Sequence, residues 1–290
     1  MKTCILYNPL AGHGDNEAKA RALSETLEGE KELVNVTKIE DAAAFFAPLS
    51  EEDTVILCGG DGTVNRFVNA IDGIDVKAGI LYYAIGTGND FVHDLGKQPG
   101  DEPFDLKPYM QNLPVVEVKG VKRRFINGIG FGIDGYCCEI GDKMKATSDK
   151  PVNYTSIAIK GLLFHYKPTD ATIIVDGVEH TYKKVWIAAG MKGRYYGGGM
   201  MTAPEQDRLN ESGEITLVLF HGTGRLKTLM IFPSIFKGEH VKHTKEVAVH
   251  TGKDITVRFS SPAPLQIDGE TVLGVTEYRV TANAAVPAKA

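Results

Sequence analysis

Residues 54–71 are the stretch that most constrains how this chain can fold. The run Thr54–Cys58 is apolar and partly β-branched, which is typical of a buried parallel strand. Beyond it, four apolar residues follow at helical spacing, at positions 64, 67, 68 and 71. Gly59, Gly60, Asp61 and Gly62 lie between the two patterns. The sequence therefore predicts a buried strand, a glycine turn and an amphipathic helix in direct succession.

This glycine turn has the composition of a phosphate-binding loop. Glycine lets a ligand approach the backbone where a Cβ would hold it away, and the first amides of a helix have no acceptor within that helix. Such amides suit a phosphate. Asp61 would repel a bare phosphate, so its presence in the turn indicates a nucleotide bound with Mg²⁺. A simple tight turn is the alternative, but three glycines, an acid and a Thr exceed what turn geometry requires.

Two similar units flank the central one. Residues 3–7 resemble a strand, with a turn at 8–14 and a helix from residue 16 to about residue 27. Residues 80–85 also resemble a strand, followed by a turn at 86–90 and a helical segment. All three turns would lie at the carboxyl edge of a parallel sheet, where open α/β folds bind ligands.

The pattern changes to β after a proline-containing linker at residues 99–114. Strands are predicted at 114–118, 124–127, 184–189, 214–220, 246–250, 255–259 and 264–267, with a hairpin over 172–180 and a helix near 153–164. Such a series predicts an antiparallel sandwich. Residues 130–135 formally match G-x-G-x-x-G, but no βαβ unit surrounds them, so we reject dinucleotide binding there.

The segments 59–65 and 86–91 resemble two signatures of the diacylglycerol kinase catalytic-domain family, lipid kinases related to sphingosine and ceramide kinases. The resemblance runs from Asn8 to Glu270 in matching order. It implies an α/β nucleotide-binding domain with a parallel sheet over 1–118 and a β-sandwich lipid-substrate domain over 119–277. Residues 278–290 would form a tail that packs on the first domain. The implied activity is transfer of the γ-phosphate of ATP to a lipid hydroxyl, with diacylglycerol as the acceptor.

The resemblance also implies site residues. Asp268 would be the general base, supported by Glu270. Mg²⁺ would be held by Asp61 and Asp90, and a further ion by Leu209, Ser212 and Glu214, although the family has Asp-Gly where this chain has Ser212 and Gly213. The residues that would contact ATP are Asn8, Thr37, Gly59, Gly60, Asp61, Gly62, Thr63, Val64, Asn65 and Thr87.

Two other functions remain open at this point. A NAD kinase has a similar length and nucleotide loop, and a non-catalytic nucleotide or lipid sensor could keep the fold with an altered metal loop. The net charge of −5 argues against general nucleic-acid binding. No signal peptide or spanning segment is evident, so we expect a cytoplasmic protein that meets lipid peripherally at a membrane surface. A homodimer is left open.

Residues 221–245 raise the question of how such a protein reaches a membrane. Five basic residues and one acid surround an apolar stretch at 226–236. The stretch predicts either a core helix kinked at Pro233 or a segment that lies in a lipid interface. The sequence alone does not decide between a core helix and an interfacial segment.

Overall fold

The computed structural model describes residues 1–9, 14–86, 88–148 and 152–282. The chain divides into two compact units, with the boundary between Gln111 and Asn112. Of the tail predicted over residues 278–290, residues 283–290 lie outside the described residues, so its packing on the first domain stays a prediction. No helix in the described part is long and apolar enough to span a bilayer.

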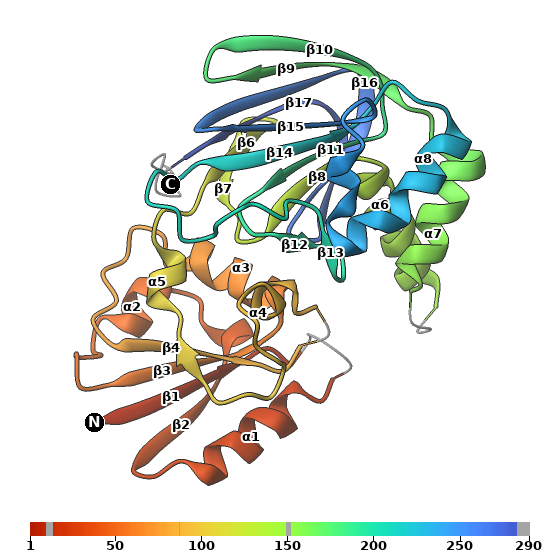
Figure 1. Cartoon of the computed structure of the whole chain (residues 1–290). Coiled ribbons are helices and arrows are strands. Elements are labelled where there is room, and N and C mark those ends of the chain that lie inside the picture. The colour runs from red at the N-terminus through yellow and green to blue at the C-terminus, as the bar shows by residue number, and fades with distance from the viewer. Residues whose placement is uncertain (10–13, 87, 149–151, 283–290) are drawn as a thin grey trace. The chain divides into compact units, whose positions relative to one another are not determined.

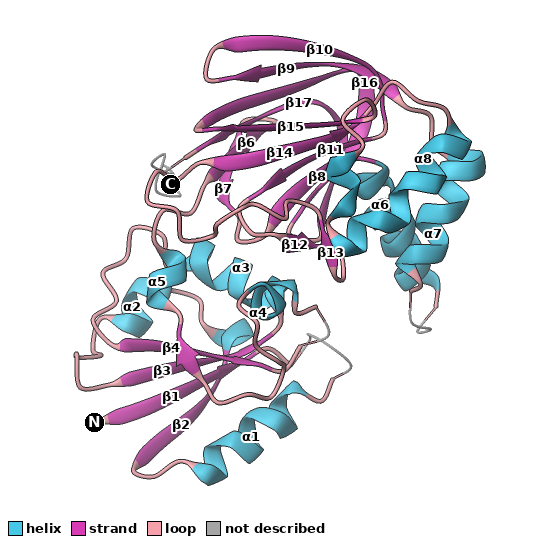
Figure 2. Cartoon of the chain, in the orientation of Figure 1, coloured by secondary structure: helices cyan, strands magenta, loops and turns pink. Residues whose placement is uncertain are grey.

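The first unit is a parallel α/β sheet (Figures 1 and 2). Its strand order is β2-β1-β3-β4-β5, and only β5 runs antiparallel to its neighbour among these strands. The elements are β1 (Lys2–Tyr7), α1 (Asn16–Thr26), β2 (Glu30–Asn35), η1 (Val36–Lys38), α2 (Ala42–Phe46), β3 (Thr54–Gly59), α3 (Asp61–Ala70), β4 (Gly79–Ala84), α4 (Asp90–Asp94), β5 (Phe104–Asp105) and α5 (Lys107–Met110).

Alternation along the central strands places helices on both faces of this sheet. Ile5 and Ile56 pack against Ala20 and Leu23 of α1 in one buried cluster. The intervening residues of β1 and β3 are also buried, so these strands are covered on both sides. Figure 1 shows α1 and α3 on opposite sides of the sheet. The predicted parallel sheet is therefore confirmed, and helices cover both of its faces.

The second unit is dominated by an antiparallel sheet. Its elements are β6 (Val115–Val118), β7 (Val121–Arg124), β8 (Gly128–Gly132), α6 (Ile133–Thr147), α7 (Tyr154–Lys160), the π-helical turn η2 (Gly161–His165), β9 (Thr169–Val175), β10 (Val178–Val185), β11 (Ile187–Met191), β12 (Tyr195–Tyr196), β13 (Met200–Met201), β14 (Ile215–Phe220), α8 (Arg225–Ile231), η3 (Phe232–Lys237), η4 (Glu239–Lys242), β15 (Val247–Gly252), β16 (Asp254–Ile267) and β17 (Glu270–Thr281).

Strand β16 joins the two layers of the sandwich. It pairs with β9 along its first half, with β8 at its end and with β17 along most of its length, and register shifts lie between Arg258 and Leu265. Phe131 of β8 stacks on Phe259 of β16 with ring centroids 3.9 Å apart. Because these side chains share one buried cluster with Ile173 and Leu217, the antiparallel sandwich is confirmed.

A helical layer covers the outer face of this sheet. Successive residues of β11 alternate between faces, so that Ala188 lies in the sandwich core while Ile187 and Ala189 lie in a second cluster. That second cluster includes side chains of α6, α7, α8 and η3. In Figure 1, α6, α7 and α8 lie in one region of the second unit, where α6 contacts α7 and α8 contacts η2, the turn that follows α7.

Several elements differ from the sequence-based prediction. Residues 121–124 form β7, whereas a strand was predicted at 124–127. The 15-residue helix α6 was not predicted, nor was β17, whose last residues had been placed in the tail. β6 had been placed in the first domain, but it pairs with β7 and β17.

Candidate functional site

The parallel strands of the first unit end together at one edge of the sheet. The register pairs Tyr7, the last residue of β1, with Asn35 of β2 and with Cys58 of β3. Asn8 and Thr37 therefore follow neighbouring strands at the same edge. In the order β2-β1-β3-β4, the chain reverses its direction across the sheet between β1 and β3. Open α/β sheets bind ligands at such a point.

The turns after β3 and β4 pack backbone against backbone. A Cβ on Gly86 would lie 2.3 Å from the Gly60 Cα, and a Cβ on Gly60 would lie 2.7 Å from the Gly88 carbonyl oxygen. Close packing therefore requires both glycines. Gly62 is different, because no atom lies within 4 Å of the position its Cβ would take. The protein gives no steric reason for glycine there, and a ligand that approaches the backbone would supply one.

The amides at the start of α3 are used unequally. The Asp61 amide donates to the Gly88 carbonyl (3.0 Å), and the Thr63 and Val64 amides donate to the Gly60 carbonyl (2.9 and 3.2 Å). Within the described residues, no acceptor takes the Gly62 amide. The phosphate-binding role of residues 59–65 stays a prediction, and the open Gly62 amide is the group at the start of α3 that suits it.

Asp61 connects the two glycine turns through its carboxylate. Its oxygens accept hydrogen bonds from the Asp90 amide (2.8 Å) and the Phe91 amide (3.2 Å), which begin α4. Asp61 and Asp90 are buried. No group of three or more His, Cys, Asp or Glu in the described part could hold a metal ion. Mg²⁺ on a nucleotide commonly takes only one or two protein carboxylates, and the metal-binding role of Asp61 and Asp90 stays a prediction.

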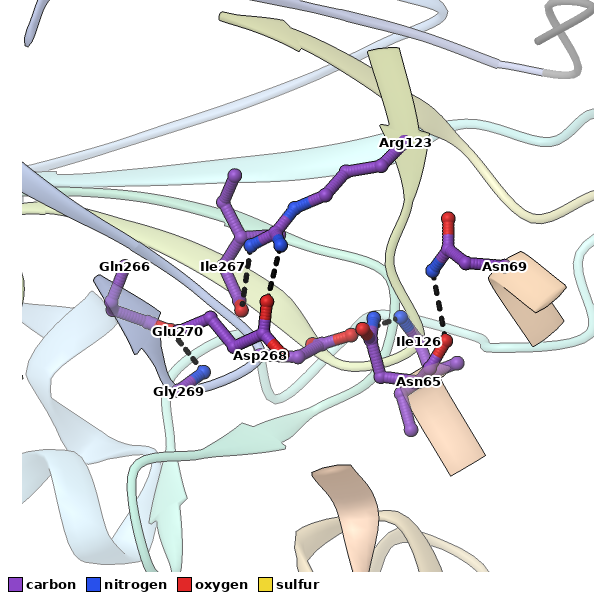
Figure 3. A network of polar contacts seen from close by, with 9 residues as sticks. All are labelled: Asn65, Asn69, Arg123, Ile126, Gln266, Ile267, Asp268, Gly269 and Glu270. Carbon is purple, nitrogen blue, oxygen red and sulfur yellow. Dashed lines mark hydrogen bonds and ion pairs between the residues drawn. The ribbon is translucent and has the colours of Figure 1, made fainter. Parts of the chain in front are cut away.

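The other predicted nucleotide contacts have local partners. The Thr37 hydroxyl donates to Asn35 Oδ1 (2.8 Å) at the end of β2. Asn8 is buried, and its carbonyl oxygen accepts from Asn16 Nδ2 (3.4 Å). The Asn65 carbonyl oxygen accepts from Asn69 Nδ2 at 2.8 Å (Figure 3). Thr87 lies outside the described residues. The nucleotide roles of these residues stay predictions.

The predicted general base lies in a hairpin turn of the second unit. Asp268 and Gly269 join β16 to β17, and both have positive φ values, 46° and 87°, as a type I′ turn requires. The Asp268 carboxylate accepts three amide hydrogen bonds, from Ile126 (2.6 Å), Asn127 (2.9 Å) and Gly128 (3.0 Å). Its main-chain amide donates to the Gly128 carbonyl (3.0 Å). The segment between β7 and β8 therefore fixes the orientation of this carboxylate.

Arg208 holds that segment from the other direction. Its guanidinium donates to the Ile126 carbonyl and, at 2.8 Å, to Asn127 Oδ1. Arg208 is buried beside Lys192, whose amide donates to the Asn127 carbonyl (2.9 Å). Burial lowers the pKa of Lys192 to about 8, and the neighbouring charge of Arg208 adds to this effect. No motif singles out either residue in the sequence.

Glu270 acts on the hairpin through Arg123. The two side chains form an ion pair, and Arg123 Nη2 also donates to the Ile267 carbonyl at 3.3 Å (Figure 3). On the other side of the turn, the Gly269 amide donates to Gln266 Oε1 (2.8 Å). Glu270 is thus linked through Arg123 to the main chain of the hairpin that carries Asp268. Its predicted catalytic role stays a prediction.

The loop predicted to hold a second metal ion is closed by amide side chains. The Glu214 carbonyl accepts from Gln206 Nε2 (3.0 Å) and Asn210 Nδ2 (3.1 Å). Ser212 Oγ donates to Asn210 Oδ1 (3.1 Å) and contacts the Glu214 carboxylate (3.0 Å). The Leu209 main-chain amide donates a hydrogen bond to Asp207 Oδ1 (2.9 Å). Two N–H donors make the Glu214 carbonyl oxygen a poor ligand for a cation, and the metal-binding role of Leu209, Ser212 and Glu214 stays a prediction.

The two remaining glycine-rich segments have structural explanations, backbone conformation in one and close packing in the other. Gly197, Gly198 and Gly199 all have positive φ and form the turn between β12 and β13. The Tyr196 hydroxyl, next to this turn, donates a hydrogen bond to the Asp134 carboxylate. Burial raises the pKa of the Asp134 carboxyl to about 6, although this hydrogen bond opposes the shift. In the formal G-x-G-x-x-G, a Cβ on Gly135 would lie 2.0 Å from the Pro264 carbonyl oxygen.

Comparisons with known proteins match both units of the chain. The model of the diacylglycerol kinase catalytic domain matches residues 2–113, and that of the YegS C-terminal NAD kinase beta sandwich-like domain matches 127–287. Diacylglycerol kinase of Mycobacterium tuberculosis H37Rv is 26% identical over 92% of this chain and 91% of its own length. Diacylglycerol kinase of Staphylococcus carnosus TM300 is 28% identical over 92% and 87%.

A solved structure shows the same fold. A diacylglycerol kinase from Bacillus anthracis str. Sterne has a TM-score of 0.60 and 17% identity, with coverage of 99% of this chain and 98% of that one. The two domain matches together define the class as lipid kinase. The chain belongs to the family that joins a diacylglycerol kinase catalytic domain to a YegS C-terminal NAD kinase beta sandwich-like domain.

Proposed function

We propose that this lipid kinase transfers the γ-phosphate of ATP to the free hydroxyl of diacylglycerol and thereby forms phosphatidic acid. The observation that carries the proposal is the Asp268 carboxylate, which three amides orient within the family's fold. Phosphoryl transfer depends on positioning and charge neutralisation more than on a covalent intermediate, which suits a fixed acceptor and a glycine cradle. The curated relatives named diacylglycerol kinase support the choice of acceptor.

Each unit contributes a separate task in this proposal. The first amides of α3, with Gly62 open to a ligand, bind the phosphates of the nucleotide. Mg²⁺, which Asp61 and Asp90 would hold, neutralises phosphate charge when bound. Asp268 orients the lipid hydroxyl and accepts its proton, while Arg208 and Glu270 fix the main chain around it. A lipid acceptor would be met at a membrane surface, by a monomer or a homodimer.

The test is a transfer assay with radiolabelled ATP. Diacylglycerol in mixed micelles, sphingosine and NAD are offered in parallel, each with and without Mg²⁺. We expect label in phosphatidic acid only with diacylglycerol and Mg²⁺. Label in NADP would assign a NAD kinase, and label in sphingosine phosphate would change the acceptor. Nucleotide binding without transfer to any acceptor would assign a sensor.

A further inference from the structure

Large apolar side chains are exposed where the helical layer of the second unit faces away from the sheet. Phe164 of η2 is 71% exposed, and Leu226 and Met230 of α8 are 73% and 78% exposed. Ile159 of α7 and Phe236 of η3 are also exposed. Leu226 and Met230 are four residues apart and therefore share one face of their helix.

These elements are neighbours in space. Arg225, the first residue of α8, donates to the carbonyl oxygens of Gly161 (3.4 Å) and Leu162 (2.7 Å) in η2. Contacts also link α7 with η2 and α8 with η3. Two segments about 60 residues apart in sequence thus form one continuous surface, called here the helical surface and defined by Ile159, Lys160, Phe164, Leu226, Lys227, Met230, Phe236 and Lys237.

The fold does not need these apolar groups for its core. On the same segment, Ile231, Phe232 and Ile235 are almost fully buried and belong to the cluster under the helices. Residues 226–236 were predicted to form either a core helix or a segment in a lipid interface. The core interpretation holds for Ile231, Phe232 and Ile235, and the exposed side chains leave the other one open. One set of side chains packs into the core, while Leu226 and Met230 project away from it. Exposed apolar groups that gather on one surface indicate an interaction site.

The charge of this surface is unlike that of the whole chain. The chain has 37 acidic and 32 basic residues, yet neither residues 152–169 nor residues 215–238 contain an Asp or Glu. Both segments carry exposed lysines, including Lys160, Lys167 and Lys237. Lys227 pairs with Glu246, whose carboxylate lies 3.8 Å from its ammonium, and Glu239, two positions after Lys237, pairs with Lys242. An acidic protein therefore presents one basic and apolar surface.

We propose that the helical surface docks this protein on an anionic lipid bilayer. Apolar side chains would enter the boundary between headgroups and acyl chains, while the lysines would lie near lipid phosphates, the pattern of interfacial helices. A second copy of the chain is a poor occupant, because a two-fold contact would place lysines against lysines. This docking rests on the proposed function in one respect, because it would give the kinase access to a lipid acceptor. Vesicle binding itself can be measured without any turnover.

The experiment compares two double variants by vesicle co-sedimentation. Leu226→Ser with Met230→Ser removes exposed apolar groups from the helical surface. Val178→Ser with Leu273→Ser is the matched control, since these side chains are similarly exposed (58% and 53%) on β10 and β17 of the same unit. Vesicles contain phosphatidylcholine alone or with 30% phosphatidylglycerol, and neither nucleotide nor diacylglycerol is present. Activity on a short-chain, water-soluble diacylglycerol is measured separately.

We expect the wild type and the control to bind the anionic vesicles, with binding weakened by high salt. The Leu226/Met230 variant should bind about tenfold more weakly while it retains activity on the soluble substrate. Equal binding of both double variants would overturn the proposal, as would equal binding to neutral and anionic vesicles. Loss of self-association in the variant, without any vesicle binding by the wild type, would assign the surface to a second copy. Inactivity of the wild type on every acceptor would contradict the proposed function alone.

Discussion

The second unit contains two Asp-Gly hairpin turns that the sequence does not distinguish. Asp176 and Gly177 join β9 to β10, and Asp268 and Gly269 join β16 to β17. The φ values are nearly the same, 48° and 84° against 46° and 87°. Both carboxylates also accept hydrogen bonds from main-chain amides of a neighbouring segment. Asp176 Oδ1 accepts those of the Lys253 and Asp254 amides, both at 2.9 Å. Turn geometry therefore gives no sign of which aspartate acts in chemistry.

The difference lies in what surrounds each turn. Asp176 is exposed and uses one oxygen, whereas Asp268 is half-buried and uses both. The segment under Asp268 is itself held by Arg208, and its hairpin is tied by Arg123 and Glu270. An aspartate in a turn needs only its local amides for a structural role. Around Asp268, a buried arginine and a partly buried arginine hold the neighbouring main chain, which indicates that the orientation of this carboxylate matters for more than the turn.

The largest expected effect separates the two aspartates directly. Asp268→Asn should lower turnover by at least about 10²-fold, because the amide cannot accept a proton, while ATP affinity changes little. Asp176→Asn should leave turnover within about twofold, since that carboxylate only bonds main-chain amides. Steady-state kinetics on diacylglycerol micelles measure both. Near wild-type turnover in the Asp268 variant would remove this residue from the mechanism and make the two turns equivalent.

A smaller effect should follow from loosening the support of Asp268. Arg208→Lys keeps the positive charge but loses the pair of guanidinium hydrogen bonds to the Ile126 carbonyl and to Asn127 Oδ1. We expect kcat to fall about tenfold with an unchanged KM for ATP, because misplacement of the acceptor acts on the chemical step. Arg258→Lys is the control, since Arg258 forms an exposed pair with Glu277. Equal kcat values for the two variants would show that Arg208 does not position Asp268.

The sequence allowed prediction of the first unit better than of the second. The strand, turn and helix repeats around Gly59 and Gly86 are local patterns, and the structure confirms their order. α6 was missed because Gly135 and Gly141 weaken helix propensity. The structure explains Gly135, since any side chain there would strike the Pro264 carbonyl. Requirements of this kind come from long-range packing and leave no local signature.

The candidate site was predictable to the same degree. Asp61 and Asp268 belong to recognisable motifs, so they could be singled out. Arg208 could not, because its contacts with Ile126 and Asn127 span more than 80 positions of sequence. The supporting shell of the second turn therefore became visible only from the fold.

The smallest effect compares the two glycines, which differ in no local respect. Gly177 and Gly269 both have strongly positive φ, and no atom lies within 4 Å of either Cβ position. Alanine at either position should therefore cost only backbone strain, about 1 kcal/mol. Denaturant titration followed by circular dichroism should show the same loss for Gly177→Ala and Gly269→Ala. Turnover should separate them, with a drop only in Gly269→Ala, because strain in that turn tilts the carboxylate of Asp268. A much larger loss of unfolding free energy in Gly269→Ala than in Gly177→Ala would mean that the turn at Asp268 contributes more to the stability of the fold than the turn at Asp176. In that case an activity defect at Asp268 could no longer be assigned to chemistry alone.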